Sequence, residues 1–278
     1  CEKMADCDDE HVDRISDLPT NVIDSILQRL PIEDLVKTSV LSRAWRYMWS
    51  STPRLEFRDD FFEKLNHLGY YLQTSSIITE ALLLHTGPIH DFAVIPPPHY
   101  PIKWDCLTKW ILFLSRKGVK YIALASQQED PYRMPTHIFS CRDLTYLYLD
   151  NFRFSVAPTF RGFSRMIELH LFGIIFESGA LESLISGCPL LANLHLSYCS
   201  GFEHIDVSAP FLQFLMIEGN EVIKSIRLKE PQYLILIQLF ADGPGDNIDR
   251  AWVADLMKDS PNIERLFLGT SYIKVSKE

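Results

Sequence analysis

A short pattern of apolar residues, which returns throughout the chain after residue 118, constrains the fold more than any other feature. Each copy reads apolar-x-x-apolar-x-apolar, and the middle apolar residues of successive copies lie 21 to 29 residues apart. A period of this length indicates a repeat architecture in which each copy contributes one structural unit. The pattern fits Val119/Ile122/Leu124, Leu144/Leu147/Leu149, Met166/Leu169/Leu171, Leu191/Leu194/Leu196, Leu212/Leu215/Ile217, Leu234/Ile237/Leu239 and Ile263/Leu266/Leu268.

Proline recurs just before four of these copies. Pro189, Pro210 and Pro261 stand two residues before the first apolar position, and Pro231 stands three before it. Each copy is expected to form a short strand whose apolar side chains point into the core, because side chains alternate between the two faces of a strand. No copy can bury its apolar edge alone, so the copies are predicted to stack into an α/β solenoid of irregular leucine-rich repeats.

The segments between the copies give further expectations. Residues 180–186 are predicted to form a short helix, which Gly187-Cys188-Pro189 would end before the next strand. Residues 110–114 are predicted to be the helix before Val119, and residues 78–84 to be an earlier strand of the same array.

The residues between the core positions of each copy are expected to line the inner, concave surface in two columns. Aromatic side chains on an exposed sheet surface are typical of protein-binding hot spots. We therefore hypothesise that a target protein binds there, with two alternatives: loops cover these side chains, or another surface binds the target. The predicted target-binding residues are Tyr146, Tyr148, His170, His195, Phe214 and Phe267. The full columns are Tyr121, Tyr146, Glu168, Asn193, Phe214, Leu236 and Arg265, and Ala123, Tyr148, His170, His195, Met216, Gln238 and Phe267.

Three short helices are expected over residues 13–50. Pro19 suits a first helical turn, and Ile23, Ile26, Leu27 and Leu30 then share one helical face. Pro31 separates this helix from a second one, and Ser42 is a plausible N-cap for a third that carries Trp45 and Trp49. Three short helices cannot bury so much apolar surface by themselves, so the surface packs either on the following domain or on a partner protein.

The same segment resembles a plant-type F-box. The resemblance rests on Asp13-Arg14-Ile15-Ser16, Leu18-Pro19, Ile23, Ile26-Leu27, Leu30-Pro31, Thr38 to Arg43, Trp45-Arg46 and Trp49. It implies that these helices bind a Skp-type adaptor, which links to cullin and RING subunits. Carried over by motif position, the adaptor-binding residues are Leu18, Pro19, Ile23, Leu27, Leu30, Pro31, Leu35, Val40, Leu41 and Trp45. Trp49 is expected to pack toward the next domain.

The order of parts resembles plant F-box/leucine-rich-repeat proteins, including a subgroup with a further C-terminal FBD domain. The matching phrases are residues 84–90, 110–119 and 187–191. No full FBD segment is seen before Glu278, so either this member lacks one or the sequence is truncated. The predicted division is a flexible tail over residues 1–11, an F-box over 12–55 and a solenoid over 56–278.

The resemblance implies a substrate-recognition subunit of a Skp-cullin-F-box ubiquitin ligase. The alternative is a non-degradative interaction scaffold that uses the same two modules. No glycine-rich phosphate loop, metalloprotease motif or nucleophile elbow occurs, so no catalytic residue is expected. His170 and His195 fall short of the three or four ligands that zinc needs, and we expect no metal or cofactor.

Composition excludes some other classes. The net charge of −9 argues against nucleic-acid binding, which requires a basic surface. No apolar run is long enough to span a membrane, and the acidic start of the chain is unlike a signal peptide, so we expect a nuclear or cytoplasmic protein. The six cysteines have no paired spacing and are interpreted as free thiols.

Overall fold

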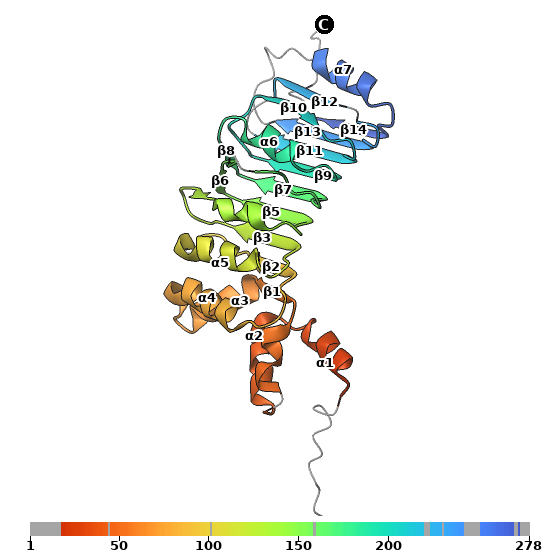
Figure 1. The fold of residues 1–278 in the computed structure, drawn as a ribbon. Helices are drawn as coiled ribbons and strands as arrows, with labels where there is room; N and C mark the ends of the chain where they lie inside the picture. Colours follow the sequence, from red (N-terminus) through yellow and green to blue (C-terminus); the bar gives the residue numbers. More distant parts are fainter. Residues whose placement is uncertain are drawn as a thin grey trace, which may run out of the picture.

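A parallel β-sheet runs through most of the chain. The computed structural model describes residues 18–43, 45–100, 102–157, 160–219, 223–229, 231–241, 251–269 and 272. Within these residues, nine strands form one sheet in which every neighbouring pair is parallel, and Figure 1 shows them stacked along the molecule. In order across the sheet they are β1 (Arg54–Phe57), β2 (Asp91–Val94), β3 (Tyr121–Ala125), β5 (Tyr146–Asp150), β7 (Glu168–Phe172), β9 (Asn193–Ser197), β11 (Phe214–Gly219), β13 (Leu236–Ala241) and β14 (Arg265–Leu268).

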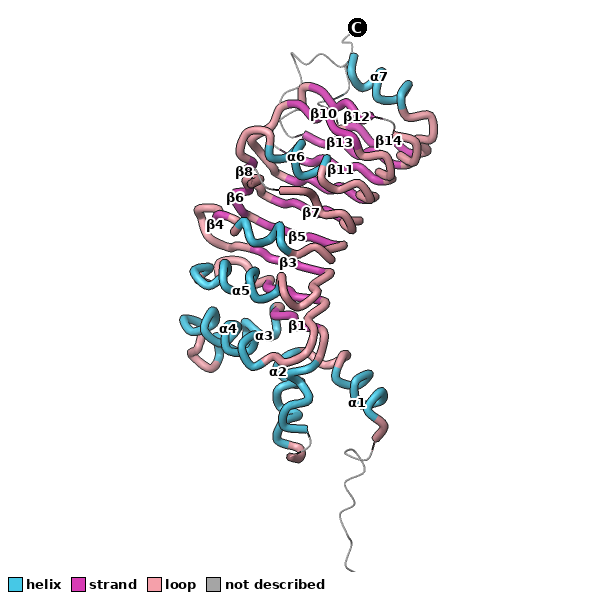
Figure 2. The backbone as a smooth tube through the Cα atoms, in the orientation of Figure 1, coloured by secondary structure: helices cyan, strands magenta, loops and turns pink. Residues whose placement is uncertain are grey.

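Helices and two small sheets return the chain from each strand to the next, and Figure 2 shows helices beside one face of the large sheet. One small sheet has the order β4-β6-β8 and the other pairs β10 with β12. The elements outside the large sheet and the N-terminal helices are α3 (Asp59–His67), η3 (Tyr71–Gln73), α4 (Thr74–Leu84), η4 (Trp104–Cys106), α5 (Leu107–Leu114), β4 (Tyr132–Arg133), η5 (Thr136–Ser140), β6 (Phe152–Phe154), β8 (Ile175–Phe176), α6 (Ala180–Ser186), β10 (His204–Ser208), β12 (Ser225–Lys229) and α7 (Ala251–Asp259).

The sequence pattern predicted seven strands of the large sheet, and the structure confirms the solenoid. These strands are β3, β5, β7, β9, β11, β13 and β14. Its core is a stack of aliphatic side chains at equivalent positions of neighbouring strands. Leu147, Leu169 and Leu194 are register partners across β5, β7 and β9, and each is at most 2% exposed. Burial of such side chains stabilises the fold, since each contributes about 1.5–3 kcal/mol relative to an exposed one.

A tight turn comes before each strand that a proline precedes, and it explains where the proline stands relative to the repeat. Leu191 N–H donates to Cys188 O, and Leu212 N–H donates to Ala209 O, so Pro189 and Pro210 each occupy the second position of a turn. Proline is favoured there because its ring fixes φ near the required value. Before β13 the bond runs from Leu234 N–H to the carbonyl of Pro231 itself, which places this proline one residue earlier.

The helix predicted over residues 180–186 is α6 (Ala180–Ser186), and the helix predicted at 110–114 lies within α5. Gly187 ends α6 with a φ of −79°, which other residues also adopt. A left-handed backbone conformation is therefore not the reason for glycine at this position. Its role is close packing, because a Cβ at this position would lie 2.8 Å from the Cα of Gly162.

One prediction in this region is wrong. Residues 78–84 were expected to form a strand, but they belong to α4, whose buried residues Thr74, Ile78 and Leu82 recur every four positions. This spacing is helical, and the continuous apolar run from residue 81 to 84 obscured it. The first two strands of the sheet, β1 and β2, were not predicted at all.

Four short segments make up the N-terminal module: α1 (Thr20–Leu27), α2 (Ile32–Lys37), η1 (Thr38–Val40) and η2 (Trp45–Ser51). The third predicted helix is therefore the 3-10 segment η2 rather than an α-helix, and η1 continues the second predicted helix. As expected, Ser42 precedes η2, and its Oγ accepts a long bond of 3.4 Å from the N–H of Trp45. The predicted tail, residues 1–11, lies outside the described residues, and β1 begins at Arg54, close to the predicted boundary between F-box and solenoid.

The two ends of the sheet differ in how well the core is covered. At one end α2 and α3 contact β1, and Leu55 and Phe57 are fully buried. At the other end the core-facing Leu266 and Leu268 of β14 are only half-buried. The N-terminal helices thus act as a cap for the first repeat, which solenoid cores require.

Truncation of one core leucine tests the stacked core. We expect Leu169→Ala to lower the free energy of unfolding by about 2–5 kcal/mol, because it leaves a cavity between two neighbouring strands. The matched control is Leu190→Ala, since Leu190 is 46% exposed and its loss should cost less than about 1 kcal/mol. Urea denaturation measures both, and equal effects would contradict the assigned core.

Candidate functional site

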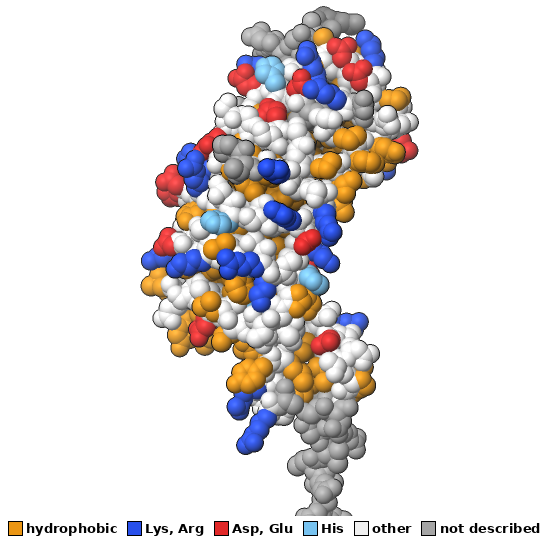
Figure 3. All heavy atoms as spheres, viewed as in Figure 1, with side chains coloured by type: hydrophobic (Ala, Val, Ile, Leu, Met, Phe, Trp, Pro, Cys, Tyr) orange, Lys and Arg blue, Asp and Glu red, His pale blue; other side chains and the backbone are white. Residues whose placement is uncertain are grey.

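The N-terminal module exposes apolar side chains that no described part of the chain buries. Pro19 and Pro31 start α1 and α2, where their carbonyls accept bonds from the N–H groups of Val22 (2.8 Å) and Leu35 (2.9 Å). Helix α1 turns Ile23 inward and leaves neighbouring Val22 partly exposed. In Figure 3 hydrophobic side chains reach the surface at this end of the molecule.

Burial divides the ten predicted adaptor-binding residues into two groups. Val40 (83% exposed), Leu41 (58%), Pro19 and Pro31 lie on the surface, and Leu18 and Leu30 are half-buried. The other four belong to the core of the chain, so they can support an adaptor-binding surface but do not form it: Ile23, Leu27, Leu35 and Trp45. The adaptor-binding role of all ten stays a prediction.

Four further exposed apolar residues were missed by the prediction: Val22, Ile26, Val36 and Tyr47. Val22 and Ile26 lie one turn apart on the stripe next to Ile23 and Leu27, and Tyr47 is 71% exposed. The signal was present in the sequence, because α1 carries more apolar residues than one buried stripe can use.

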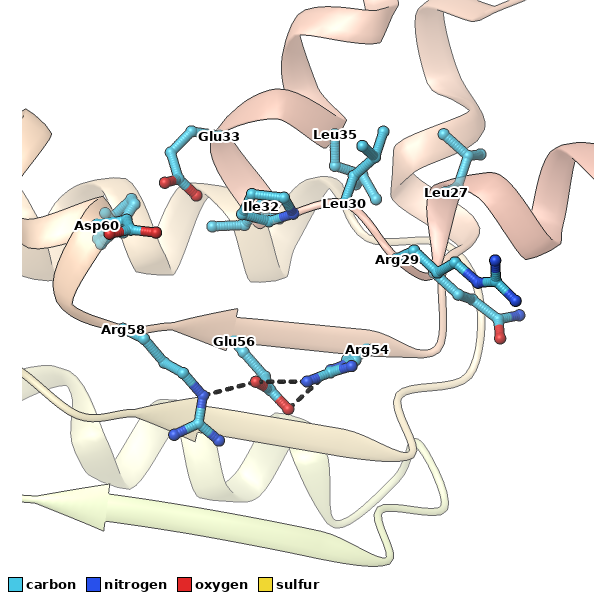
Figure 4. A pocket seen from close by; sticks show the side chains of 13 residues that line it. Leu27, Arg29, Leu30, Ile32, Glu33, Leu35, Arg54, Glu56, Arg58 and Asp60 are labelled. Atoms are coloured by element: carbon cyan, nitrogen blue, oxygen red, sulfur yellow. Dashed lines mark hydrogen bonds and ion pairs between the residues drawn. The ribbon is translucent and has the colours of Figure 1, made fainter.

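A cavity of about 270 Å³ separates the N-terminal helices from the first strand, as Figure 4 shows. On its floor Glu56 accepts bonds from Arg54 (Nε–Oε1 2.8 Å) and Arg58 (Nε–Oε2 2.7 Å). Burial opposes ionisation of Glu56, but the two guanidinium groups outweigh it and hold its pKa below the ordinary value. The carboxylate is thus paired with two arginines of the same segment, and the cluster lines the cavity from the side of the first strand.

The second candidate surface is the face of the large sheet that lies opposite the apolar core, which we call the open face. The strand register aligns the two predicted columns: Tyr146 is paired with Glu168, and Tyr148 with His170, which pairs with His195. Phe214 and Phe267 are 39% and 44% exposed. The register thus places the six predicted target-binding residues on one surface, and whether they bind a target is untested.

Aromatic rings form a continuous ladder across this face. Tyr121 stacks on Tyr146 with ring centroids 4.4 Å apart, and Tyr146 stacks on His170 at 5.1 Å. His195 meets His170 edge-on at 5.6 Å. Burial raises the pKa of Tyr146 and of Tyr148 to about 12, so both are neutral donors at physiological pH. A rigid ladder of stacked rings is suited to binding.

A hydrogen-bonded chain on this face involves a serine and a histidine but does not form a nucleophile. His195 Nε2 is 2.7 Å from Ser197 Oγ, which donates in turn to Glu218 Oε2 at 3.5 Å. In a catalytic triad the histidine stands between the other two residues. Here the serine does, and its side chain is almost fully buried. Burial is the larger cause that lowers the pKa of His195, and the neighbouring His170 is the smaller one. The lowered pKa keeps the imidazole neutral.

Three residues of the open face were missed: Asp150, Phe172 and Glu218. Each lies one position beyond the repeat pattern, at the residue that follows the last core position of β5, β7 and β11. Asp150 receives a single weak bond, from Tyr148 Oη at 3.5 Å. Burial of this carboxyl raises its pKa to about 6.

The described cysteines are buried or half-buried thiols. Burial raises the pKa of Cys141, Cys188 and Cys199 to about 12, so these thiols are protonated at neutral pH. A covalent ubiquitin carrier needs a thiolate. Within the residues that the structure describes, no group of three metal-ligating side chains occurs, and no helix has the length and hydrophobicity to cross a lipid bilayer.

The chain is similar to known plant proteins over most of its length. A model of the F-box domain matches residues 15–57, and a model described as the leucine-rich repeats of FBD-associated F-box protein At5g56370 matches residues 107–248.

Three proteins of Arabidopsis thaliana illustrate the similarity. F-box/FBD/LRR-repeat protein At1g13570 is 39% identical over 83% of this chain and 54% of its own length. F-box/FBD/LRR-repeat protein At1g78750 is 31% identical over 76% of this chain and 48% of its own length. Putative FBD-associated F-box protein At5g56440 is 28% identical over 85% of this chain and 51% of its own length. The chain therefore spans about half the length of these relatives.

The raised pKa of Asp150 predicts a pH-dependent stability. The folded chain holds this proton more tightly than the unfolded chain, whose aspartates titrate near 3.8, so stability falls as the pH rises from about 4 to about 6. Asp150→Asn removes the charge and should raise the free energy of unfolding at pH 7.5 by about 1 kcal/mol, after allowance for solvent screening of a half-buried group. Near pH 4 the gain should vanish.

Urea denaturation at both pH values measures this effect. Asp143→Asn is the matched control, because Asp143 is exposed and pairs with Arg165 at 3.0 Å, so its replacement should give no gain. A gain for Asp150→Asn of the same size at both pH values would contradict the assignment.

Proposed function

Because the chain belongs to the plant F-box/leucine-rich-repeat family, we propose that it is the substrate-recognition subunit of a Skp-cullin-F-box ubiquitin ligase. In this proposal the N-terminal helices bind a Skp-type adaptor, which links the chain to a cullin and a RING subunit. The open face of the sheet binds the target protein. The chain itself supplies no catalytic group, and it promotes ubiquitin transfer by raising the effective concentration of the target near the activated carrier.

The observation that carries the proposal is the exposed apolar surface of the N-terminal module. Val40, Leu41 and Tyr47 are each more than half exposed within a segment of eight residues. Leaving such side chains in water is unfavourable, and exposed apolar patches mark protein-binding surfaces. The buried side chains beneath them hold the helices in place, so the surface is preformed for a partner.

The open face supports the second half of the proposal. Its aromatic ladder is held by ring stacking and by the strand register, so its side chains lose little conformational freedom when a partner binds. Tyrosine in a rigid setting is enriched at binding hot spots.

Charge substitution of one exposed leucine tests the adaptor-binding surface. We expect Leu41→Arg to weaken binding of a purified Skp-type adaptor by at least about tenfold, because it places a charge in an apolar contact. Leu83→Arg is the matched control, since Leu83 is 72% exposed on α4, outside the N-terminal module. Isothermal titration calorimetry measures both, and equal affinities of the two variants and the unmodified chain would contradict the proposal.

Degradation is tested separately from binding, because a non-degradative scaffold would also bind the adaptor. Affinity purification with the proteasome inhibited should recover the adaptor, the cullin and a target that carries ubiquitin. The Leu41→Arg variant should recover the target without ubiquitin. A target that neither gains ubiquitin nor accumulates when the chain is removed would favour the scaffold.

A further inference from the structure

The open face has an unusual charge composition. No lysine or arginine occurs in β3, β5, β7, β9, β11 or β13, all of whose residues the structure describes. The same strands carry three carboxylates, namely Asp150, Glu168 and Glu218. In Figure 3, which looks onto the helix-bearing side of the molecule, lysine and arginine side chains are instead spread over the middle repeats. Cations are thus absent from these six central strands, whereas Arg54 on β1 and Arg265 on β14 lie at the two ends of the sheet.

These carboxylates lack the cationic partner that some acidic groups elsewhere in the described chain have. Tyr148 Oη is 3.5 Å from Asp150, and Ser197 Oγ is 3.5 Å from Glu218. Among the described residues, the carboxylate of Glu168 is bonded to His170 Nε2, at 3.3 Å. Over the described part of the chain, no lysine or arginine lies within ion-pair distance of any of the three.

Some acids on other surfaces are paired with a lysine or an arginine. Asp206 pairs with Lys229 at 3.2 Å on the small sheet, and Glu56 accepts bonds from two arginines on β1. A half-buried carboxylate with no cation costs stability, which an external cation would recover. The raised pKa of Asp150 agrees with this cost.

The side chains beside the carboxylates also favour a cation. Tyr146 and Tyr148 lie on the strand that carries Asp150, and Phe172 is the register partner of Asp150 on β7. Aromatic faces attract lysine and arginine, and the attraction strengthens when water is excluded. An acidic group next to aromatic rings is therefore matched to a basic side chain.

The register sets the spacing between the two outer carboxylates. Asp150, Phe172, Ser197 and Glu218 are successive partners across β5, β7, β9 and β11. Three strand spacings separate Asp150 from Glu218, which amounts to about 14 Å. An extended peptide that crosses the strands advances about 3.3–3.6 Å per residue, so its matching side chains would lie about four residues apart.

We propose that the open face binds an extended segment of a target protein that carries two basic residues about four positions apart. One of these residues lies against Asp150, and the other lies against Glu218. The aromatic ladder packs against the residues between and beside them. This inference deepens the proposed function, on which it rests for the assumption that the bound segment belongs to a target.

Selection from a random dodecapeptide phage library on the purified chain tests the inference. We expect the enriched peptides to carry lysine or arginine pairs at the predicted spacing. A synthetic, fluorescein-labelled peptide from this set is then titrated by fluorescence anisotropy. Its affinity should fall at least about tenfold for the variant Asp150→Asn/Glu168→Gln/Glu218→Gln, because the variant removes both carboxylates that face the basic residues, together with the third carboxylate of the same sheet face.

A control variant with the same change in net charge separates this site from general attraction to an acidic protein. Glu63→Gln/Glu80→Gln/Asp259→Asn replaces three exposed acids on α3, α4 and α7 and should leave the affinity within about twofold. Circular dichroism checks that both variants fold. If the triple variant of the open face does not fold, the single variants Asp150→Asn and Glu218→Gln are compared instead, each with an expected loss of affinity.

Several outcomes would overturn the inference. They are enrichment of peptides without basic residues, no enrichment at all, or equal binding of a basic peptide to both triple variants. Adaptor binding is measured on the same preparation, so the two proposals can fail separately. If the adaptor does not bind but basic peptides bind the open face, the ligase proposal is contradicted and the peptide site is supported. If the adaptor binds and no preference for basic peptides is found, only the peptide site is contradicted.

Discussion

The parallel register of the large sheet is the constraint on which the rest of this structure depends. Leucine-type side chains of neighbouring strands lie directly against one another, as Leu147, Leu169 and Leu194 do. Because side chains alternate along a strand, the register that stacks the core also aligns the residues of the open face at the spacing of the strands. A shift by one residue in any strand would bury polar residues and expose leucines, so the core fixes the geometry of the binding surface.

Most of the solenoid follows from the sequence because each repeat carries its own apolar pattern and a turn before it. The pattern fails where a unit departs from the template. In β1 only Leu55 and Phe57 alternate with charged residues, and the strand is short. Helix α4 was mistaken for a strand because residues 81–84 are all apolar, although only Leu82 among them is fully buried. Strand and helix compete for such runs, and tertiary packing decides between them.

The two candidate surfaces were predictable to different extents. The repeat pattern gave the columns of the open face, because the template distinguishes inward from outward positions. It did not give Asp150 or Glu218, which lie just past its last core position. Motif resemblance located the N-terminal surface but did not separate Ile23, Leu27, Leu35 and Trp45, which are buried, from Val40 and Leu41, which are exposed. A motif contains residues that pack inside the domain as well as residues that contact a partner. The motif alone therefore does not distinguish the two groups.

The chain retains side chains that its own stability does not favour, and they are concentrated on the two candidate surfaces. Val40, Leu41 and Tyr47 expose apolar area on the N-terminal module, and Asp150 holds a half-buried carboxylate without a cation on the open face. Local departures from what stability favours tend to occur at functional sites. On the first strand, by contrast, Glu56 is paired with both Arg54 and Arg58. Under the two proposals, an apolar partner covers the first surface and a basic segment covers the second.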